Sequence, residues 1–220
     1  MPKEGIIYYE FDARDHVVND PGDRNQPVHL GCDIGNQGAI VFFQEKMRAM
    51  RNADGTPRTE KGRPVPALGL HVVDELLPDA MSTEQAMQKA AARGWKIDPA
   101  RSIIFVDPTT RRDEIASIRR VFGDSIRIIK KERGDLAENV EYGHDCVNAA
   151  FRDVDGNVRL TISDKLPRMQ RSLLSVITRY HRGPNGKPVR DDKVDHVLDA
   201  FRYPVAHFIP IRKAEGYGVY

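Results

Sequence analysis

Apolar runs along the chain alternate between lengths typical of strands and spacings typical of helices. A hairpin is predicted at residues 28–43, and further strands at 5–11, 68–77, 102–106, 126–129 and 158–162. Apolar positions three and four residues apart predict helices that start at Ser82, Thr110 and near Asp192, and others over 138–152 and 166–180. This order indicates an α/β fold, with a central mixed sheet flanked by helices.

The predicted hairpin places a carboxylate at the end of a buried strand. Residues 29–44 read HLGCDIGNQGAIVFFQ, so Asp33 ends the first apolar run, and Gly35 and Gly38 allow a tight connection. An acidic residue at the rim of a buried strand needs a partner, because unpaired buried charge is costly. We hypothesise that the partner is a metal ion and that later acidic residues converge on it.

A second aspartate stands in the same kind of position. Asp107 ends the apolar run at 102–106, and Pro108 stops the strand and presents the carboxylate at the edge of the sheet. An Asp-Pro pair alone more often caps a turn. Two strand-terminal aspartates in one sheet are more informative, because adjacent strands can bring them within reach of one ion.

The last predicted helix carries two more carboxylates. Its sequence VDHVLDAFRY at 194–203 places Asp195 and Asp199 one turn apart, with Arg202 beside them and His196 further round. An apolar stripe is expected to pack this helix on the sheet, formed by Val194, Leu198, Phe201, Val205 and Phe208. An ordinary surface Asp–Arg pair has the same spacing, but the two strand-terminal aspartates favour a functional role. Pro204 is expected to kink the helix or end its regular bonding.

The ligand types restrict the metal and the chemistry. Three carboxylates, without cysteine and with at most one histidine, are hard oxygen ligands that suit Mg²⁺ or Mn²⁺ rather than structural zinc. Two such ions about 4 Å apart activate water and stabilise the leaving oxygen in phosphodiester cleavage. A P-loop is excluded, because GPNGK at 183–187 is followed by Pro188 and has the wrong spacing.

Charge is nearly balanced over the whole chain but clustered along it. The net charge is +2, whereas residues 96–133 hold ten basic and six acidic residues, and 165–193 hold eight basic and two acidic ones. Either cluster alone would be consistent with a solvated surface, but two that flank the candidate carboxylates favour a nucleic acid partner. The candidate DNA contacts are Arg111, Arg112, Lys130, Lys131, Arg168, Arg171 and Lys187.

Length and composition set further limits. The 220 residues fit a single domain, for which we expect an N-terminal strand and loop at 1–27, a core at 28–208 and a tail at 209–220. Two cysteines, Cys32 and Cys146, make no disulfide framework, so a reducing, cytoplasmic setting is expected. No apolar run approaches the ~20 residues of a membrane span. The charged, Gly- and Pro-containing segment 48–66 predicts an exposed excursion between strands.

Four motifs, in this order, resemble the C-terminal nuclease domain of tailed-bacteriophage terminase large subunits: GIIYYEFD, CDIGNQGAIV, IFVDP and DHVLDAFRY. The resemblance covers nearly the whole chain, and the last motif is its most specific part. It implies an RNase H-like fold and a two-metal endonuclease that cuts concatemeric viral DNA during packaging. The implied catalytic metal ligands are Asp33, Asp107 and Asp199, and the residues implied beside the site are Asp195, His196 and Gly35.

The resemblance also implies partners and a location. These are double-stranded DNA, a packaging ATPase domain, the small terminase subunit and the portal, in the host cytoplasm at the procapsid. Full-length members of the family begin with the ATPase domain, which this chain lacks, so we expect an excised domain or a split gene.

Other functions fit parts of the same pattern. A Holliday-junction resolvase, or another structure-specific RNase H-like nuclease, can use the same carboxylates. The DIGNQG turn also resembles the phosphate-binding hairpin of actin-like ATPases, although no second such lobe is evident. In a non-catalytic DNA-docking module the acids would be structural.

Overall fold

A mixed β-sheet forms the centre of the molecule in the computed structural model, which describes residues 5–34, 38–130, 140–185, 188–189 and 195–211. Its strands are β1 (Val17–Val18), β2 (His29–Asp33), β3 (Ala39–Ala49), β6 (Pro66–Leu76), β7 (Ile103–Val106), β8 (Arg127–Lys130) and β9 (Leu160–Ser163). They lie in the order β1-β9-β6-β3-β2-β7-β8. Strand β3 is antiparallel to both neighbours, and the other pairs are parallel. The mixed sheet expected from the sequence is confirmed.

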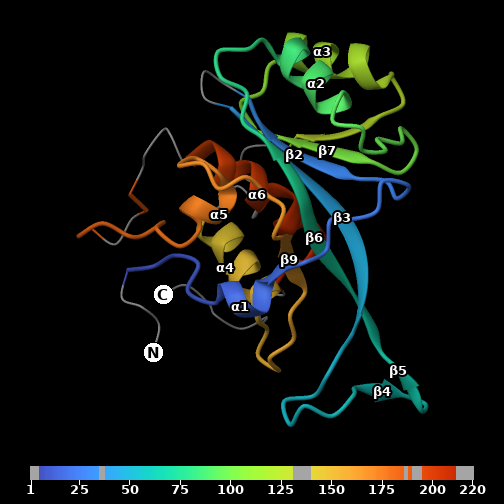
Figure 1. Cartoon of the computed structure of the whole chain (residues 1–220), viewed down its shortest axis with the longest axis vertical. Helices are drawn as coiled ribbons and strands as arrows, with labels where there is room; N and C mark the ends of the chain where they lie inside the picture. Colours follow the sequence, from blue (N-terminus) through green and yellow to red (C-terminus); the bar gives the residue numbers. More distant parts are fainter. Residues whose placement is uncertain (1–4, 35–37, 131–139, 186–187, 190–194, 212–220) are drawn as a thin grey trace, which may run out of the picture.

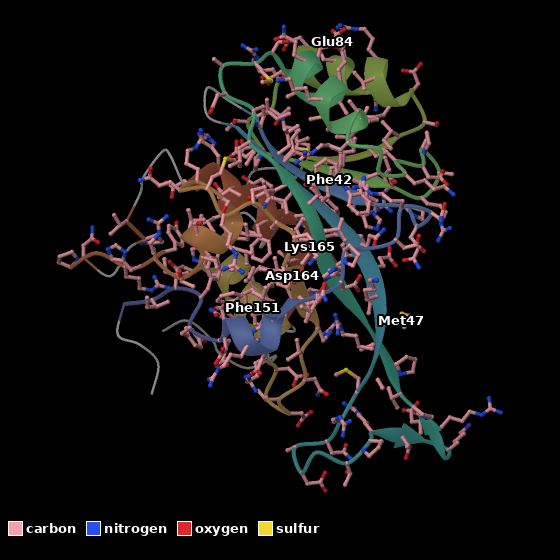
Figure 2. The ribbon with its side chains drawn as sticks, viewed as in Figure 1. Phe42, Met47, Glu84, Phe151, Asp164 and Lys165 are labelled. Atoms are coloured by element: carbon pink, nitrogen blue, oxygen red, sulfur yellow. The ribbon has the colours of Figure 1, made fainter. Side chains whose placement is uncertain are left out.

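Helices cover both faces of this sheet (Figure 1). They are α1 (Ala13–His16), α2 (Thr83–Ala91), α3 (Arg112–Phe122), α4 (Val140–Phe151), α5 (Leu173–Val176) and α6 (Asp195–Phe208). Alternate residues of β3 face opposite layers, so Val41 and Phe43 pack with α4 and α6, whereas Phe42 packs with α2 and α3. Figure 2 labels Phe42 and, in the other layer, Phe151. The sheet is therefore buried on both sides where α6 meets it.

Strands β3 and β6 continue beyond the helices as a two-stranded arm (Figure 1). They pair from Ile40 with Leu76 to Ala49 with Pro66, and the short strands β4 (Thr59–Glu60) and β5 (Arg63–Pro64) lie at the far end. Residues 51–64 are exposed, so the prediction of an exposed excursion at 48–66 is confirmed for most of the segment, although Met50 is buried.

Local signals predicted several element ends correctly. Ser82 caps α2, and its hydroxyl and the Gln85 side chain form the expected capping box. Gly123 ends α3 with a φ of 90°. The predicted Thr110–Asp113 capping box is wrong, because the N-cap is Arg111, one residue later, and α3 begins at Arg112. Instead, the Glu114 carboxylate accepts a hydrogen bond from the Arg111 backbone N–H at 2.7 Å.

The prediction of a strand at 5–11 is wrong. Only Ile6 makes an isolated bridge, with His181, whereas Ile7 and Tyr8 are buried in the core beside α4 and α6. These residues are apolar because they fill the core, without pairing in the sheet. The segment from 12 to 27, read as a loop, contains α1 and β1.

The predicted helix at 166–180 is reduced to α5 at Leu173–Val176. Its start is determined by tertiary contact, since the buried carboxylate of Glu75 on β6 accepts from the Leu173 N–H at 2.8 Å. Leu166 belongs to the core without being helical. Helical spacing of apolar residues here reflects burial of an irregular segment.

The last helix is described from Asp195 and continues through Pro204 to Phe208. Pro204 therefore does not end it. The predicted start near Asp192 and the first stripe residue, Val194, lie outside the described residues. The rest of the stripe packs into the core as expected. In the described part of the chain, no helix is long and apolar enough to cross a membrane.

Candidate active site

Two of the predicted carboxylates emerge at the same edge of the sheet. Strands β2 and β7 are parallel neighbours, and Cys32 pairs with Val106. Asp33 and Asp107 follow these two residues directly, so they stand side by side at the ends of adjacent strands. The expectation that neighbouring strands present both aspartates is confirmed.

Helix α6 reaches this edge because Gly31 of β2 has no side chain. A Cβ at Gly31 would collide with the carbonyl oxygen of Ala200 and lie 2.9 Å from Cγ of Pro204. Proline lacks the N–H that would bond the carbonyl four residues earlier, so Ala200 has no usual helical donor. That carbonyl faces Gly31 instead. The close contact brings the start of α6, with His196 and Asp199, toward the end of β2.

Asp33 is paired with His196. The two facing atoms, Oδ2 of Asp33 and Nδ1 of His196, are 2.9 Å apart, and the Asp33 side chain is 14% exposed. Burial raises the pKa of Asp33, the contact with His196 opposes this, and the charges of Asp199 and Asp107 raise it further. The contact with Asp33 raises the pKa of His196. Asp33 is thus close enough to the other two aspartates to be repelled by them.

Asp107 accepts hydrogen bonds on both carboxylate oxygens. The Tyr203 hydroxyl donates to Oδ2 at 2.7 Å, and the Thr109 backbone N–H donates to Oδ1 at 2.6 Å, together with the Thr109 hydroxyl. Burial alone would raise the pKa of Asp107, but these hydrogen bonds bring it below its usual value. Asp107 is therefore ionised at neutral pH.

Asp199 is held by a buried arginine. Nη2 of Arg202 lies 2.5 Å from Oδ1 of Asp199, and Arg202 is 4% exposed. Its stem fits against Gly143 of α4, where a Cβ would lie 2.5 Å from Cδ of Arg202. The alternative of an ordinary surface Asp–Arg pair is wrong, because the guanidinium lies inside the α4–α6 interface. Local spacing carries no signal for this burial.

The three aspartates are near one another but do not share one centre. Each carboxylate contacts a different α6 side chain: Asp199 and Asp107 accept hydrogen bonds, and Asp33 lies in ion-pair range of His196. Within the described ranges, no three His, Cys, Asp or Glu side chains are arranged to hold a metal ion. Convergence of Asp33, Asp107 and Asp199 on one ion therefore stays a prediction, as do the roles of Asp195 and His196. Gly35 lies outside the described residues.

The donor set nevertheless fits a hard divalent cation. All three candidate ligands are carboxylates, and their mutual repulsion contributes to the raised pKa of Asp33. A cation among them would relieve this repulsion. Binding through all three requires side-chain rearrangement, because Asp33 faces His196 and Asp199 faces Arg202.

Some of the candidate DNA contacts lie near Asp107. Arg111 and Arg112 are exposed at the start of α3, which follows the Asp107 turn, and Nζ of Lys130 bonds the Thr110 carbonyl at 2.5 Å. A surface hollow on α3 is lined by Arg112, Ile115, Ala116, Arg119, Arg120, Gly123 and Asp124. The sequence interpretation missed Arg119 and Arg120. They follow Arg112 by seven and eight residues, about two helical turns, so all three lie on the same side of α3.

The second basic cluster is divided. Arg168 is exposed, and Arg171 is paired with Asp79, both in the segment between β9 and α5. Lys131 and Lys187 lie outside the described residues. Of the predicted basic residues, Arg111, Arg112 and Lys130 are placed beside the Asp107 turn by the start of α3 and the Lys130–Thr110 bond.

Comparison with known proteins was informative at the level of structure. No protein-family model and no curated protein sequence matches the chain. The large terminase from a thermophilic bacteriophage aligns with a TM-score of 0.61 and 20% identity, over 93% of this chain and 45% of that one. The P22 large terminase nuclease domain aligns with a TM-score of 0.56 and 14% identity, over 94% and 93% of the two chains.

Because these identities are low, the alignments establish the fold alone. The chain spans less than half the length of the thermophilic phage's large terminase and nearly all of the P22 nuclease domain. The sequence motifs pointed to the same group of proteins. The chain has the RNase H-like α/β fold of the nuclease domains of bacteriophage large terminases.

Proposed function

We propose that this chain is a metal-dependent endonuclease that cuts double-stranded concatemeric viral DNA during genome packaging. One observation carries the proposal. Asp33 and Asp107 leave adjacent parallel strands at one edge of the sheet, and α6 docks on Gly31 so that Asp199 joins that edge. The fold shared with the P22 large terminase nuclease domain supports it.

The aspartates would hold Mg²⁺ or Mn²⁺, two ions per site. When bound, such ions supply an activated water and stabilise the leaving oxygen of a phosphodiester. Asp107 is ready to bind, since its hydrogen bonds keep it ionised. Asp33 and Asp199 must each exchange an α6 partner for the cation. Nδ1 of His196 lies 2.9 Å from Oδ2 of Asp33, so a protonated imidazole would balance the charge of that carboxylate until a cation replaces it.

The exposed arginines of α3 would hold the DNA backbone. Arg112 and Arg119 lie on the helix that follows the Asp107 turn, so phosphates bound there would lead toward the aspartates. Arg111 and Lys130 flank the same turn. Contacts of this kind give affinity without base selection, which suits an enzyme that acts on long DNA of varied sequence.

The length comparison supports a proposal about the wider assembly. Since the chain spans 45% of the thermophilic phage's large terminase, we propose that it acts together with a packaging ATPase domain. The small terminase subunit and the portal complete the proposed partners, at the procapsid in the host cytoplasm.

Cleavage of supercoiled plasmid tests the proposal. Purified protein should nick or linearise the plasmid with Mg²⁺ or Mn²⁺, and Asp33→Ala, Asp107→Ala and Asp199→Ala should each lower the rate by at least about 100-fold. Glu60→Ala is a matched control, because this carboxylate is exposed on β4 in the arm. Uncut plasmid with both metals, or aspartate variants as active as Glu60→Ala, would contradict the proposal.

A substrate panel separates the related nucleases. Linear duplex, a four-way junction and an RNA–DNA hybrid should be compared at equal concentration. We expect duplex DNA to be cut at least as fast as the other two. A strong preference for the junction would favour a resolvase instead.

A further inference from the structure

Helix α6 contributes one polar side chain to each candidate carboxylate. His196 faces Asp33 at 2.9 Å, Arg202 bonds Asp199 at 2.5 Å, and Tyr203 bonds Asp107 at 2.7 Å. The first two contacts involve charged partners that a bound cation would replace or compete with. The third is a neutral hydroxyl, and it joins α6 to the residue after β7.

Tyr203 is firmly anchored. It is 8% exposed, and it packs in one core cluster with Ile103 and Phe105 of β7. Burial, followed by the charges of Asp199, Asp107 and Asp33, raises the pKa of its hydroxyl far above the usual value. The hydrogen-bond geometry makes the Tyr203 hydroxyl the donor and Oδ2 of Asp107 the acceptor.

Two contacts connect α6 closely with the aspartate-bearing strands. Gly31 sets the approach of α6 to β2, which carries Asp33. Tyr203 spans from α6 to Asp107 after β7. Tyr203 is also four residues after Asp199, so both lie on one face of the helix, one turn apart. Packing of α6 on β7 holds the helix near the Asp107 turn, and the Tyr203 hydroxyl bonds the Asp107 carboxylate itself to the helix that carries Asp199.

Thr109 cannot perform the same role. It bonds the other oxygen of Asp107, but it belongs to the same turn and moves with that residue. Thr109 stabilises the turn, but it does not connect Asp107 to α6.

We propose that Tyr203 is a positioning residue, whose hydroxyl orients the Asp107 carboxylate so that it binds a divalent cation together with Asp199. This inference rests on the proposed function of the same site. Without the hydroxyl, the carboxylate keeps its Thr109 hydrogen bonds on Oδ1, but Oδ2 loses its bond to α6, so fixing Oδ2 must accompany cation binding. Hydrogen-bond partners of metal ligands typically contribute about 10- to 100-fold in metal affinity.

The test is Tyr203→Phe, which removes the hydroxyl and keeps the ring. Calorimetric titration of the DNA-free protein with Mn²⁺ should give a dissociation constant raised about 10- to 100-fold. The midpoint of thermal unfolding without metal should stay within a few degrees of the wild type. Tyr142→Phe is the matched control, because that hydroxyl donates at 3.2 Å to the carbonyl of Ile211, away from the aspartates. Its Mn²⁺ affinity should equal that of the wild type.

A second comparison protects the test against general destabilisation. In an Asp107→Asn background, Tyr203→Phe should change the remaining Mn²⁺ affinity by less than about twofold, because the oriented ligand is already lost. If Tyr203→Phe lowered the Mn²⁺ affinity as much in the Asp107→Asn background as in the wild type, the proposal would be overturned. The same holds if the Tyr203→Phe variant bound Mn²⁺ as tightly as the Tyr142→Phe variant. A wild type that binds neither Mn²⁺ nor Mg²⁺ would overturn the proposed function as well, so the two failures are distinguishable.

Discussion

The two ends of strand β3 differ sharply in what holds them. At its start, Ala39 pairs with Asp33 between two helical layers, and the first six residues of the strand are buried. At its end the strand pairs only with β6, and Met47, labelled in Figure 2, is 66% exposed. Side chains at the start are packed between the helices of both layers, whereas several at the end are exposed beside β6. A chemical site that needs fixed distances belongs at the packed end.

The largest expected effect follows from adding one methyl group at the packed end. Gly31→Ala should lower the free energy of unfolding by roughly 3 kcal/mol, because Cβ would collide with the Ala200 carbonyl and displace α6. Urea unfolding measures this change. Gly55→Ala in the arm is the counterpart, because nothing lies within 4 Å of its Cβ. The cost that remains for Gly55→Ala comes from its positive φ of 81°, and it is about 1 kcal/mol. Equal losses at both glycines would contradict the comparison.

The second effect is a pH dependence at the packed end. Burial raises the pKa of Glu75 from 4.5 to about 7, and the nearby charge of Asp74 adds to this. Because the folded pKa exceeds the unfolded one, the contribution to stability is complete below pH 4.5 and is lost as the pH rises through about 7. The full loss corresponds to roughly 3 kcal/mol as an upper estimate.

Glu75→Gln should remove this dependence. The amide oxygen can still accept the hydrogen bond from the Leu173 N–H, and no charge develops at high pH. We expect the variant to be more stable than the wild type at about pH 8 and similar to it at about pH 4.5, by urea unfolding at each pH. A wild-type minus variant difference that stays constant across this range would show that Glu75 does not titrate in this window.

The smallest effect is expected at the far end of the arm. Replacing residues 51–64 by a short Asn-Gly turn should change the free energy of unfolding by less than about 1 kcal/mol, since these residues are exposed and loop closure depends weakly on length. Thermal unfolding measures this. A loss as large as that of Gly31→Ala would mean that the arm is part of the packed core.

Local pattern was sufficient where an element is buried in a regular way. The hairpin from β2 to β3 and strand β7 follow from apolar runs, and the capping box of α2 follows from Ser82 and Gln85. Asp33 and Asp107 were identified because each ends such a run. That pattern could not show which apolar segments pair. Residues 5–11 and 166–172 carry apolar side chains that fill the core without regular structure.

The sequence by itself determined most strands of the central sheet and the acidic residues that end two of them, because these depend on neighbouring residues. Only the tertiary structure decided how α6 meets the sheet. Gly31 matters because the Ala200 carbonyl lies over it, Arg202 is buried because Gly143 makes room, and Tyr203 reaches Asp107 across 96 residues of chain. Such contacts join segments far apart in the sequence, and no local periodicity records them.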